Sequence, residues 1–201
     1  MKIWMNMVAG NARQEKTANR PAMALTLAVA SLLVMAAPPV MAEEAKGSKA
    51  HIAAVTKKVD GAFIRANEAR TNDWPSHGLD YAETRFSKLQ QIHAANVKDL
   101  GLVWSYNLES TRGVEATPLV VDGVMYVSAS WSIVHAIDVR SGKKIWTFDP
   151  KVPREAAYKG CCDVVNRGVA LYEGKVFVAS FDGRLIALDA ATGQKVWEKD
   201  T

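Results

Sequence analysis

The sequence contains Val121-Asp122-Gly123-Val124-Met125-Tyr126-Val127, and 51 residues later it contains Tyr172-Glu173-Gly174-Lys175-Val176-Phe177-Val178. In both segments a glycine-containing turn is flanked by β-branched and aromatic residues, which is typical of two strands joined by a tight turn. Because the two segments align without a gap, they indicate two copies of one structural unit.

The same offset extends through the rest of the unit. It aligns Ala136-x-Asp138 with Ala187-x-Asp189, and Ser141-Gly142-x-x-x-Trp146 with Thr192-Gly193-x-x-x-Trp197. Glycine permits a turn with positive φ, aspartate can accept hydrogen bonds from the turn, and tryptophan offers a large flat surface for packing between units. A period of about 50 residues with this content predicts an all-β fold, a β-propeller of which about two blades are present.

A propeller blade buries its apolar faces against neighbouring blades, so two blades do not complete a ring. The stretch Gly101-Leu102-Val103-Trp104 is similar to the last strand of a preceding, incomplete unit. We therefore interpret residues 101–201 as the first blades of a propeller, and we expect the chain ending at Thr201 to be a truncated or partial product.

Length and composition favour a globular protein. The chain has 201 residues, of which 49% are hydrophobic and 23% are charged, and this is enough for an ordinary domain with a core. The formal net charge is +4, but four basic residues belong to a predicted leader: Lys2, Arg13, Lys16 and Arg20. The remaining charge gives no reason to expect a nucleic-acid partner.

Residues 1–42 have the order of a secretory signal peptide, with a basic opening, an apolar run and then Val40-Met41-Ala42. We expect cleavage after Ala42 and export to the periplasm. A transmembrane anchor is the alternative, but a span needs about 20 apolar residues, and Pro38-Pro39 ends the run early. In such an oxidising compartment two cysteines are expected to be bridged rather than free.

Residues 43–100 are predicted to form a helical and irregular lead-in segment. Between Gly47 and Arg70 the apolar residues recur at helical spacing, which predicts a helix packed on the outside of the main domain; they are Ile52, Val55, Val59, Phe63 and Ala66. Further along, Ser87-x-x-Gln90 has the spacing of a capping box, so short helical turns are expected between Ser87 and Leu100.

Two adjacent cysteines, Cys161 and Cys162, lie between the two repeats. A disulfide between neighbours is strained, because consecutive Cα atoms lie about 3.8 Å apart whereas bridged cysteines usually lie about 4.4–6.8 Å apart. Such strain is often retained where it has a function. Two reduced core cysteines and an intermolecular bridge are the alternatives.

Two segments precede the repeats and are expected at the same end of the central channel. Gly113-Val114-Glu115-Ala116-Thr117-Pro118 precedes the first unit, and the segment from Cys161 to Gly168 precedes the second. Glu115 offers a hydrogen-bond acceptor there, and Arg167 offers a planar fork suited to a carboxylate. Alternatively, Glu115 and Arg167 pair with each other or cap strands.

Five motifs together resemble those of the pyrroloquinoline quinone (PQQ)-dependent alcohol dehydrogenases, and the resemblance runs from about Asn72 to Thr201. They are Trp74-Pro75-Ser76-His77-Gly78, Arg85-Phe86-Ser87-x-Leu89, Gly113-x-Glu115-Ala116-Thr117-Pro118, Cys161-Cys162-Asp163-Val164-Val165-Asn166-Arg167-Gly168 and Asp182-Gly183-Arg184-Leu185. The resemblance implies an eight-bladed propeller with the quinone in its central channel. It also implies a disulfide of Cys161 and Cys162 as one flat wall, with Glu115 and Arg167 at the polar rim of the cofactor.

The resemblance further implies oxidation of a primary alcohol to an aldehyde by hydride transfer to the quinone, with an aspartate as base and calcium or a lanthanide as Lewis acid. In the family those catalytic groups and metal ligands belong to later blades, so none is expected in this chain. Asp163 and Asp182 are therefore assigned no catalytic role. Cytochrome c or a membrane quinone would accept the electrons, and a haem c domain after Thr201 is consistent with the resemblance.

The four histidines show no metal-ligand spacing and are predicted to be structural or at the surface; they are His51, His77, His93 and His135. Tyr158 and Lys159, beside the cysteines, are candidates to line an entrance.

Two alternatives to an active enzyme stay open. A non-catalytic propeller that binds proteins would share the blade repeat but has no reason to contain a cysteine pair followed by Asn166-Arg167-Gly168. An inactive fragment of the enzyme would share both features. We expect the 201-residue chain by itself neither to close a ring nor to oxidise alcohols.

Overall fold

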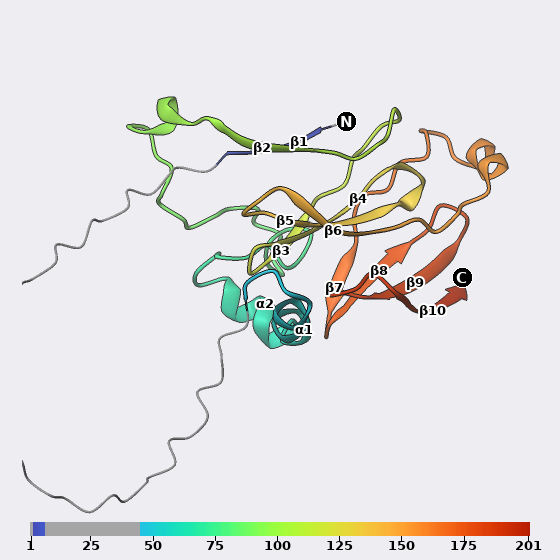
Figure 1. Ribbon diagram of the computed structural model, residues 1–201, viewed down its shortest axis with the longest axis horizontal. Helices are drawn as coiled ribbons and strands as arrows, with labels where there is room; N and C mark the ends of the chain where they lie inside the picture. The colour runs from blue at the N-terminus through green and yellow to red at the C-terminus, as the bar shows by residue number, and fades with distance from the viewer. Residues whose placement is uncertain (1, 7–44) are drawn as a thin grey trace, which may run out of the picture. The chain divides into compact units, whose positions relative to one another are not determined.

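The computed structural model describes residues 2–6 and 45–201 (Figure 1). Strands dominate the chain after Leu100, as the repeat predicted. No helix in the described part has the length and apolar content needed to cross a bilayer. In chain order the elements are β1 (Lys2–Asn6), α1 (Lys49–Lys57), α2 (Gly61–Asn67), η1 (Val97–Asp99), β2 (Leu102–Asn107), β3 (Leu119–Val121), β4 (Val124–Ser128), η2 (Ser130–Ser132), β5 (Val134–Asp138), β6 (Lys143–Phe148), η3 (Arg154–Lys159), β7 (Ala170–Tyr172), β8 (Lys175–Ala179), β9 (Arg184–Asp189) and β10 (Lys195–Asp200).

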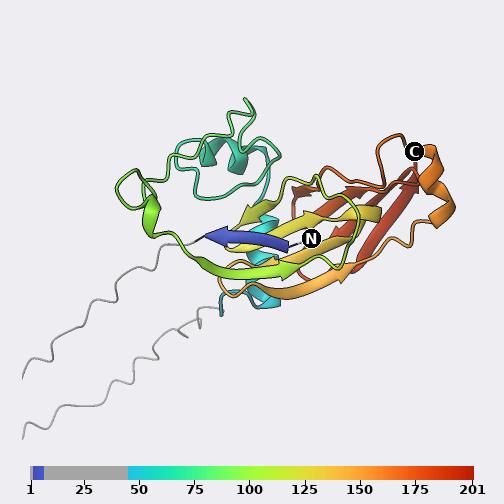
Figure 2. The same ribbon diagram turned by 90° about the horizontal axis from the view of Figure 1, so that it is seen from above.

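Each sequence repeat forms one antiparallel sheet of four strands in chain order. The first blade has the order β3-β4-β5-β6, the second has the order β7-β8-β9-β10, and β1 pairs with β2 in a separate two-stranded sheet. The registers match, because Tyr126 lies opposite Ala136 in the first blade and Phe177 lies opposite Ala187 in the second. Figure 2 shows the three sheets one behind another. The predicted partial propeller is confirmed.

In each blade the repeated aspartate closes the turn between the last two strands. In the second blade the Gly193 N–H donates to the Asp189 carbonyl oxygen at 2.8 Å, and the Thr192 N–H donates to the Asp189 carboxylate at 2.8 Å. In the first blade the Gly142 N–H likewise donates to the Asp138 carbonyl oxygen at 2.8 Å. The repeated Asp and Gly therefore build the same turn twice.

A tryptophan at the end of the first blade packs on this turn of the second blade. The Trp146 Nε1–H donates to the Ala190 carbonyl oxygen at 3.0 Å. Gly193 has a φ of 70°, and a Cβ added to it would lie 2.6 Å from the Trp146 ring. Glycine is required at this position both for the backbone conformation and for the approach of the indole.

Trp104 makes the equivalent contact on the first blade. Its Nε1–H donates to the Val139 carbonyl oxygen at 2.7 Å, and a Cβ on Gly142 would lie 2.6 Å from its ring. Strand β2 therefore packs on the first blade in the same way as β6 packs on the second blade. This agrees with the interpretation of Gly101–Trp104 as the last strand of a preceding unit.

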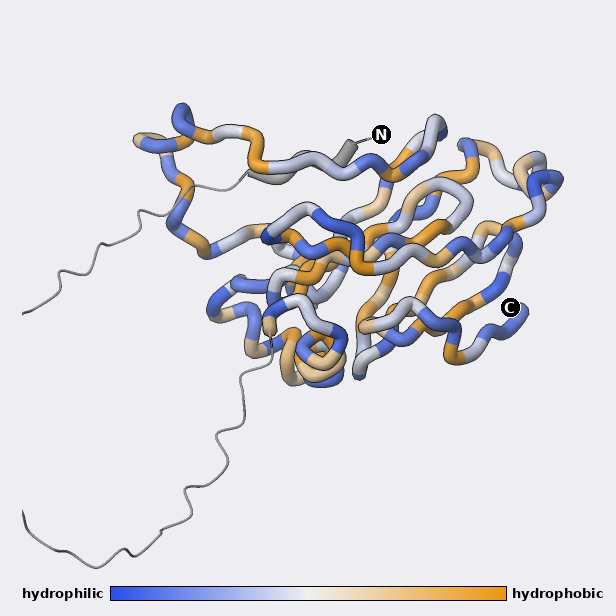
Figure 3. Tube along the Cα trace, viewed as in Figure 1, coloured by the Kyte–Doolittle hydropathy of each residue, from blue (hydrophilic) through white to orange (hydrophobic). Residues whose placement is uncertain are grey.

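In the part of the chain that the structure describes, two core clusters lie on opposite faces of the first blade. Alternate residues of β4 enter them: Val124 and Tyr126 belong to the cluster between the blades, and Met125 and Val127 to the cluster facing β2. Period-two alternation therefore buries both faces of this strand. In Figure 3 hydrophobic stretches follow the strands, whereas hydrophilic colour is concentrated at turns and ends.

The single helix predicted between Gly47 and Arg70 is wrong in one respect, because the segment forms two helices. The first helix ends at Lys57, with Lys58 as its C-cap. Asp60 has an extended backbone and caps the second helix, because its carboxylate accepts the Phe63 N–H at 2.7 Å. The break turns Ala66 to solvent and buries Ile64 instead. Packing outside the main domain is confirmed, since the Gly174 N–H of the second blade donates to the Thr56 carbonyl oxygen of α1 at 3.0 Å.

The capping box predicted at Ser87 is also wrong. The Ser87 hydroxyl accepts only the Leu89 N–H, at 3.2 Å, and no helix starts there. The segment up to Gln90 is exposed, so no packing favours a helix that short. The one helical turn between Ser87 and Leu100 is η1.

Most of the predicted leader, including the cleavage point after Ala42, lies outside the described residues. Its residues 2–6 form β1, which pairs antiparallel with β2 in the register Lys2 to Asn107. A signal peptide cleaved after Ala42 therefore stays a prediction, with a transmembrane anchor as its alternative.

His135 of β5 is a buried titratable group, 2% exposed. Its Nδ1 lies 3.3 Å from the Tyr106 Oη and 3.2 Å from the Thr147 Oγ1, and its Nε2 has no hydrogen-bond partner among the described residues. Burial lowers the pKa of His135 to about 4.

Neutral His135 should make stability depend on pH. The unfolded chain takes up the proton near pH 6.5 and the folded chain only near pH 4, so this stability is complete above pH 6.5 and is lost as the pH falls towards 4. The full loss is on the order of 3 kcal/mol. Urea unfolding at pH 7 and pH 4.5 should therefore show a larger drop for the parent chain than for His135→Gln. The exposed His93→Gln is the control, and an equal drop in all three chains would contradict the prediction.

The tryptophan contact predicts a difference between two glycines that both have positive φ. Gly193→Ala and Gly183→Ala share the backbone strain, since φ is 70° and 90°, but a Cβ on Gly183 has nothing within 4 Å. Gly193→Ala should therefore lower the free energy of unfolding by about 1–3 kcal/mol more than Gly183→Ala does, because only it displaces Trp146. Urea unfolding measures both, and equal losses would show that the indole does not press on this turn.

Candidate cofactor site

Two segments that precede the blades lie side by side. The segment 113–118 leads into β3, and the segment 161–168 leads into β7. The Thr117 N–H donates to the Arg167 carbonyl oxygen at 3.2 Å, and the Gly113 N–H donates to the Asp163 Oδ2 at 3.3 Å. The structure thus brings the segment of Glu115 against the segment of the cysteine pair.

Gly168 permits this close approach. Its φ is 142°, and a Cβ added to it would lie 3.3 Å from the Thr117 carbonyl oxygen. A larger residue would push the two segments apart where Arg167 and Thr117 are bonded.

Glu115 and Arg167 form an ion pair across the two segments. The Arg167 Nη2 lies 3.5 Å from the Glu115 Oε2, and the side chains are 83% and 48% exposed. One alternative from the sequence, that these residues pair with each other, therefore holds in the structure. An ion pair this exposed is weak, so the guanidinium can exchange this partner for another carboxylate.

Cys161 and Cys162 are exposed free thiols in the structure. The predicted disulfide is not formed there and stays a prediction, while their exposure rules out the alternative of core cysteines. The Cys161 thiol raises the pKa of Cys162 by hydrogen bonding and by its charge; the charge of Glu115 raises it further and that of Arg167 lowers it. All four predicted cofactor residues therefore lie within electrostatic reach of one another.

The loop that carries the cysteines is anchored to both blades. Val164 is fully buried, and its carbonyl oxygen accepts the Trp131 N–H at 2.9 Å. The Asn166 Nδ2 donates to the Ser132 Oγ at 3.2 Å and to the Ala179 carbonyl oxygen at 2.9 Å. The buried Val164 and the half-buried Asn166 thus hold the loop to both blades, while the two thiols before them are exposed.

Asp163 has a partner, Arg112, that was not predicted from the sequence. The Arg112 Nε–H donates to the Asp163 Oδ1 at 2.7 Å, and these hydrogen bonds lower the pKa of Asp163 to about 2. Asp182 is paired in a similar way, 2.7 Å from the Arg184 Nη2. One signal could have identified Arg112: it precedes Asp163 by 51 residues, the repeat period.

The histidines singled out in the sequence do not belong to this cluster. His51 Nε2 lies 3.1 Å from the Asp122 Oδ2, and His77 Nε2 lies 2.6 Å from the Arg85 Nη2. Within residues 2–6 and 45–201 no three His, Cys, Asp or Glu side chains gather as a metal site would require. Tyr158, 79% exposed, and Lys159 lie in η3, just before the cysteines.

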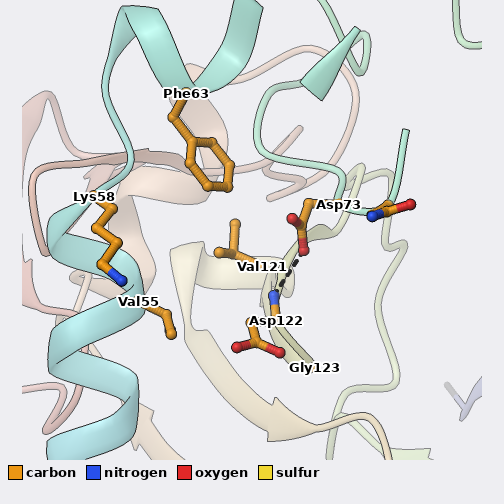
Figure 4. Close-up of a pocket in the computed structure, with 8 residues that line it drawn as sticks. Val55, Lys58, Phe63, Asp73, Val121, Asp122 and Gly123 are labelled. Atoms are coloured by element: carbon orange, nitrogen blue, oxygen red, sulfur yellow. Dashed lines mark hydrogen bonds between the residues drawn. The ribbon is translucent and has the colours of Figure 1, made fainter. Parts of the chain in front are cut away.

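A cavity of about 400 Å³ lies beside the turn between β3 and β4 (Figure 4). The Asp122 N–H donates to the Asp73 Oδ1 at 2.7 Å across it, and burial raises the pKa of Asp73. Glu115 precedes β3 whereas Asp122 follows it, so this cavity is separate from the cysteine cluster. It is lined by Val55, Lys58, Phe63, Asn72, Asp73, Val121, Asp122 and Gly123.

Comparisons with known proteins match this arrangement. Residues 74–198 match the family described as "PQQ: Glucose/ethanol/alcohol dehydrogenase, beta-propeller domain". The chain is 71% identical over 155 residues to a quinohemoprotein alcohol dehydrogenase of Comamonas testosteroni, covering 77% of this chain and 22% of the relative. It is 67% identical over 133 residues to a 1-butanol dehydrogenase (cytochrome c) of Thauera butanivorans, covering 66% and 19%.

Solved structures agree. The crystal structure of the Comamonas testosteroni enzyme matches with a TM-score of 0.75, covering 76% of this chain and 23% of that one. A europium-containing methanol dehydrogenase matches at 38% identity with a TM-score of 0.65, covering 69% and 25%. The chain spans about a fifth of the length of the curated relatives named above. With its blade repeat and its fold, this chain belongs to the family of PQQ-dependent alcohol dehydrogenase β-propellers.

Proposed function

We propose that this chain supplies one wall of a PQQ site in a periplasmic enzyme that oxidises a primary alcohol to an aldehyde. The observation that carries the proposal is the cluster of Cys161, Cys162, Glu115 and Arg167 where two blades begin. Loops on a rigid propeller are where such sites are usually built.

The chemistry of these residues fits the cofactor. PQQ is a flat quinone that carries carboxylates, and a guanidinium binds a carboxylate through two parallel hydrogen bonds. Arg167 is exposed enough to do so, and Glu115 beside it can accept a hydrogen bond from the cofactor. When bound, PQQ supplies the hydride acceptor for alcohol oxidation, while these residues bind and orient it.

The relatives suggest the rest of the system. One is named for cytochrome c and others for haem, which supports cytochrome c as electron acceptor and a haem c group elsewhere in the enzyme. The europium-containing relative supports a lanthanide as an alternative to calcium. A signal peptide over residues 1–42 would deliver the chain to the periplasm, where PQQ and the acceptor would meet it.

The oxidising compartment and the adjacent positions predict that Cys161 and Cys162 are bridged to each other in the purified protein. Alkylation without reductant, followed by digestion and mass spectrometry, should show both thiols blocked within one peptide. Alkylation after reduction should then label both, which serves as the control. Free thiols in the unreduced sample would contradict the prediction.

PQQ itself tests the site. Arg167→Gln removes a charge-assisted hydrogen bond worth about 1.5–3 kcal/mol, so PQQ should bind this variant about ten- to hundredfold more weakly than the parent chain when titrated by tryptophan fluorescence. Arg140→Gln is the matched control, because Arg140 also pairs with a carboxylate, that of Asp138, but lies at a turn of the first blade.

Equal PQQ affinities of the two variants would contradict the proposed site. In the same samples, supplemented with calcium, we expect no dye-linked alcohol oxidation, because the family's base and metal ligands belong to later blades. Turnover by this chain would show that the catalytic groups are already present.

A further inference from the structure

We infer that Asp163, held by Arg112, is a positioning residue that sets the place of the cysteine pair relative to Glu115. The role of Asp163 in cofactor binding rests on the proposed function, in which the cysteine pair and Glu115 contact one cofactor. The hydrogen bonds of Asp163 are a property of this chain alone.

The carboxylate of Asp163 bonds to both segments of the site. Its Oδ1 accepts the Arg112 Nε–H at 2.7 Å, a second guanidinium N–H, and the Val164 N–H at 2.8 Å. Its Oδ2 accepts the Gly113 N–H at 3.3 Å. Asp163 directly follows Cys162, and Gly113 lies two residues before Glu115. One side chain therefore joins the backbones on which the thiol and the Glu115 carboxylate are carried.

Two hydrogen-bonded junctions join these two described segments, beside the exposed ion pair of Glu115 and Arg167, and the Asp163 junction is one of them. The other is the bond from the Thr117 N–H to the Arg167 carbonyl oxygen. Glu115 lies between the two junctions on its segment, so its backbone is held on both sides. Without the Asp163 junction, the two segments would be bonded to each other only at Arg167.

The bond also connects equivalent positions of successive repeats. Arg112 and Asp163 are separated by 51 residues, as are Gly123 and Gly174. At this position the first unit has a positive side chain, Arg112, and the second has a negative one, Asp163. The two can therefore bind each other. Asparagine could not replace the aspartate fully, because its amide would place an N–H group against a donor from Arg112 or Gly113.

Asp163 is suited to positioning rather than to proton transfer. Its pKa is lowered to about 2 by the hydrogen bonds from Arg112, so it stays ionised throughout the pH range in which enzymes work. Both oxygens are already occupied by donors, four in all. Its charge therefore serves to hold Arg112 and Gly113.

Cys162 can report the geometry without any cofactor. In the Cys161→Ser chain it is the single thiol, and the pH dependence of its alkylation by iodoacetamide gives its pKa. Since the charge of Glu115 raises this pKa, Glu115→Gln should shift the alkylation midpoint to lower pH. In an Asp163→Asn background, and separately in an Arg112→Gln background, that shift should disappear. In the control background Arg140→Gln it should persist.

A persisting shift in both clamp variants would overturn the inference, and so would the absence of any shift in the parent chain. Arg112→Gln keeps the test decisive even if Asp163→Asn fails to fold, because it leaves the carboxylate in place. Circular dichroism and urea unfolding of each chain show which variants are folded.

PQQ binding then tests the purpose. We expect the Kd for PQQ to rise about tenfold in Asp163→Asn and in Arg112→Gln, and the double variant to bind no more weakly than Asp163→Asn alone. If a variant loses the effect of Glu115 on Cys162 alkylation but binds PQQ with unchanged affinity, the role of Asp163 in cofactor binding is overturned. A parent chain that fails to bind PQQ would instead count against the proposed function, while the alkylation result still decides the geometry.

Discussion

The contact between a tryptophan and the glycine turn of the following unit orders this structure. Trp104 and Trp146 make it in the same way, each donating an indole N–H to a backbone carbonyl oxygen beside a glycine with positive φ. The Tyr126 hydroxyl donates to the same Ala190 oxygen as Trp146 does, at 3.0 Å. A large aromatic surface and a directional hydrogen bond together set both the spacing and the register of neighbouring blades.

The site depends on that register. Because successive blades repeat the same arrangement, the segments that lead into β3 and β7 meet at one end of the strands. Polar contacts then determine the detail: Asp163 bonds across to Gly113, and Arg167 bonds to Thr117 and pairs with Glu115. The blades provide the rigid support, and short loops present the chemistry.

The β-propeller architecture explains why one blade would carry only part of the proposed cofactor site. A propeller spreads one central site over several blades, so each blade contributes a few side chains and needs its neighbours to complete the ring. This chain carries thiols, a carboxylate and a guanidinium suited to hold a flat, anionic quinone. In the function proposed above, the cofactor accepts the hydride, and these residues would bind and orient the cofactor.

Sequence alone determined the features that repeat or that depend on residue type. The 51-residue offset predicted the blades, their turns and the packing role of the tryptophans, and the adjacent cysteines with Glu115 and Arg167 indicated the candidate site. The repeated features follow from local conformational preferences of glycine, aspartate and β-branched residues. These preferences act over a few positions, so they can be read from a repeated sequence pattern.

Tertiary structure decided what depends on groups far apart in the chain. Helical spacing did not reveal that one helix would end at Lys57 and that Asp60 would cap another, and nothing local shows that His135 is buried with its Nε2 unpaired among the described residues. The bond between Arg112 and Asp163 joins residues that are unremarkable separately. Such bonds form only when the blades pack in register, because packing, and not local propensity, brings their donors and acceptors within hydrogen-bonding distance.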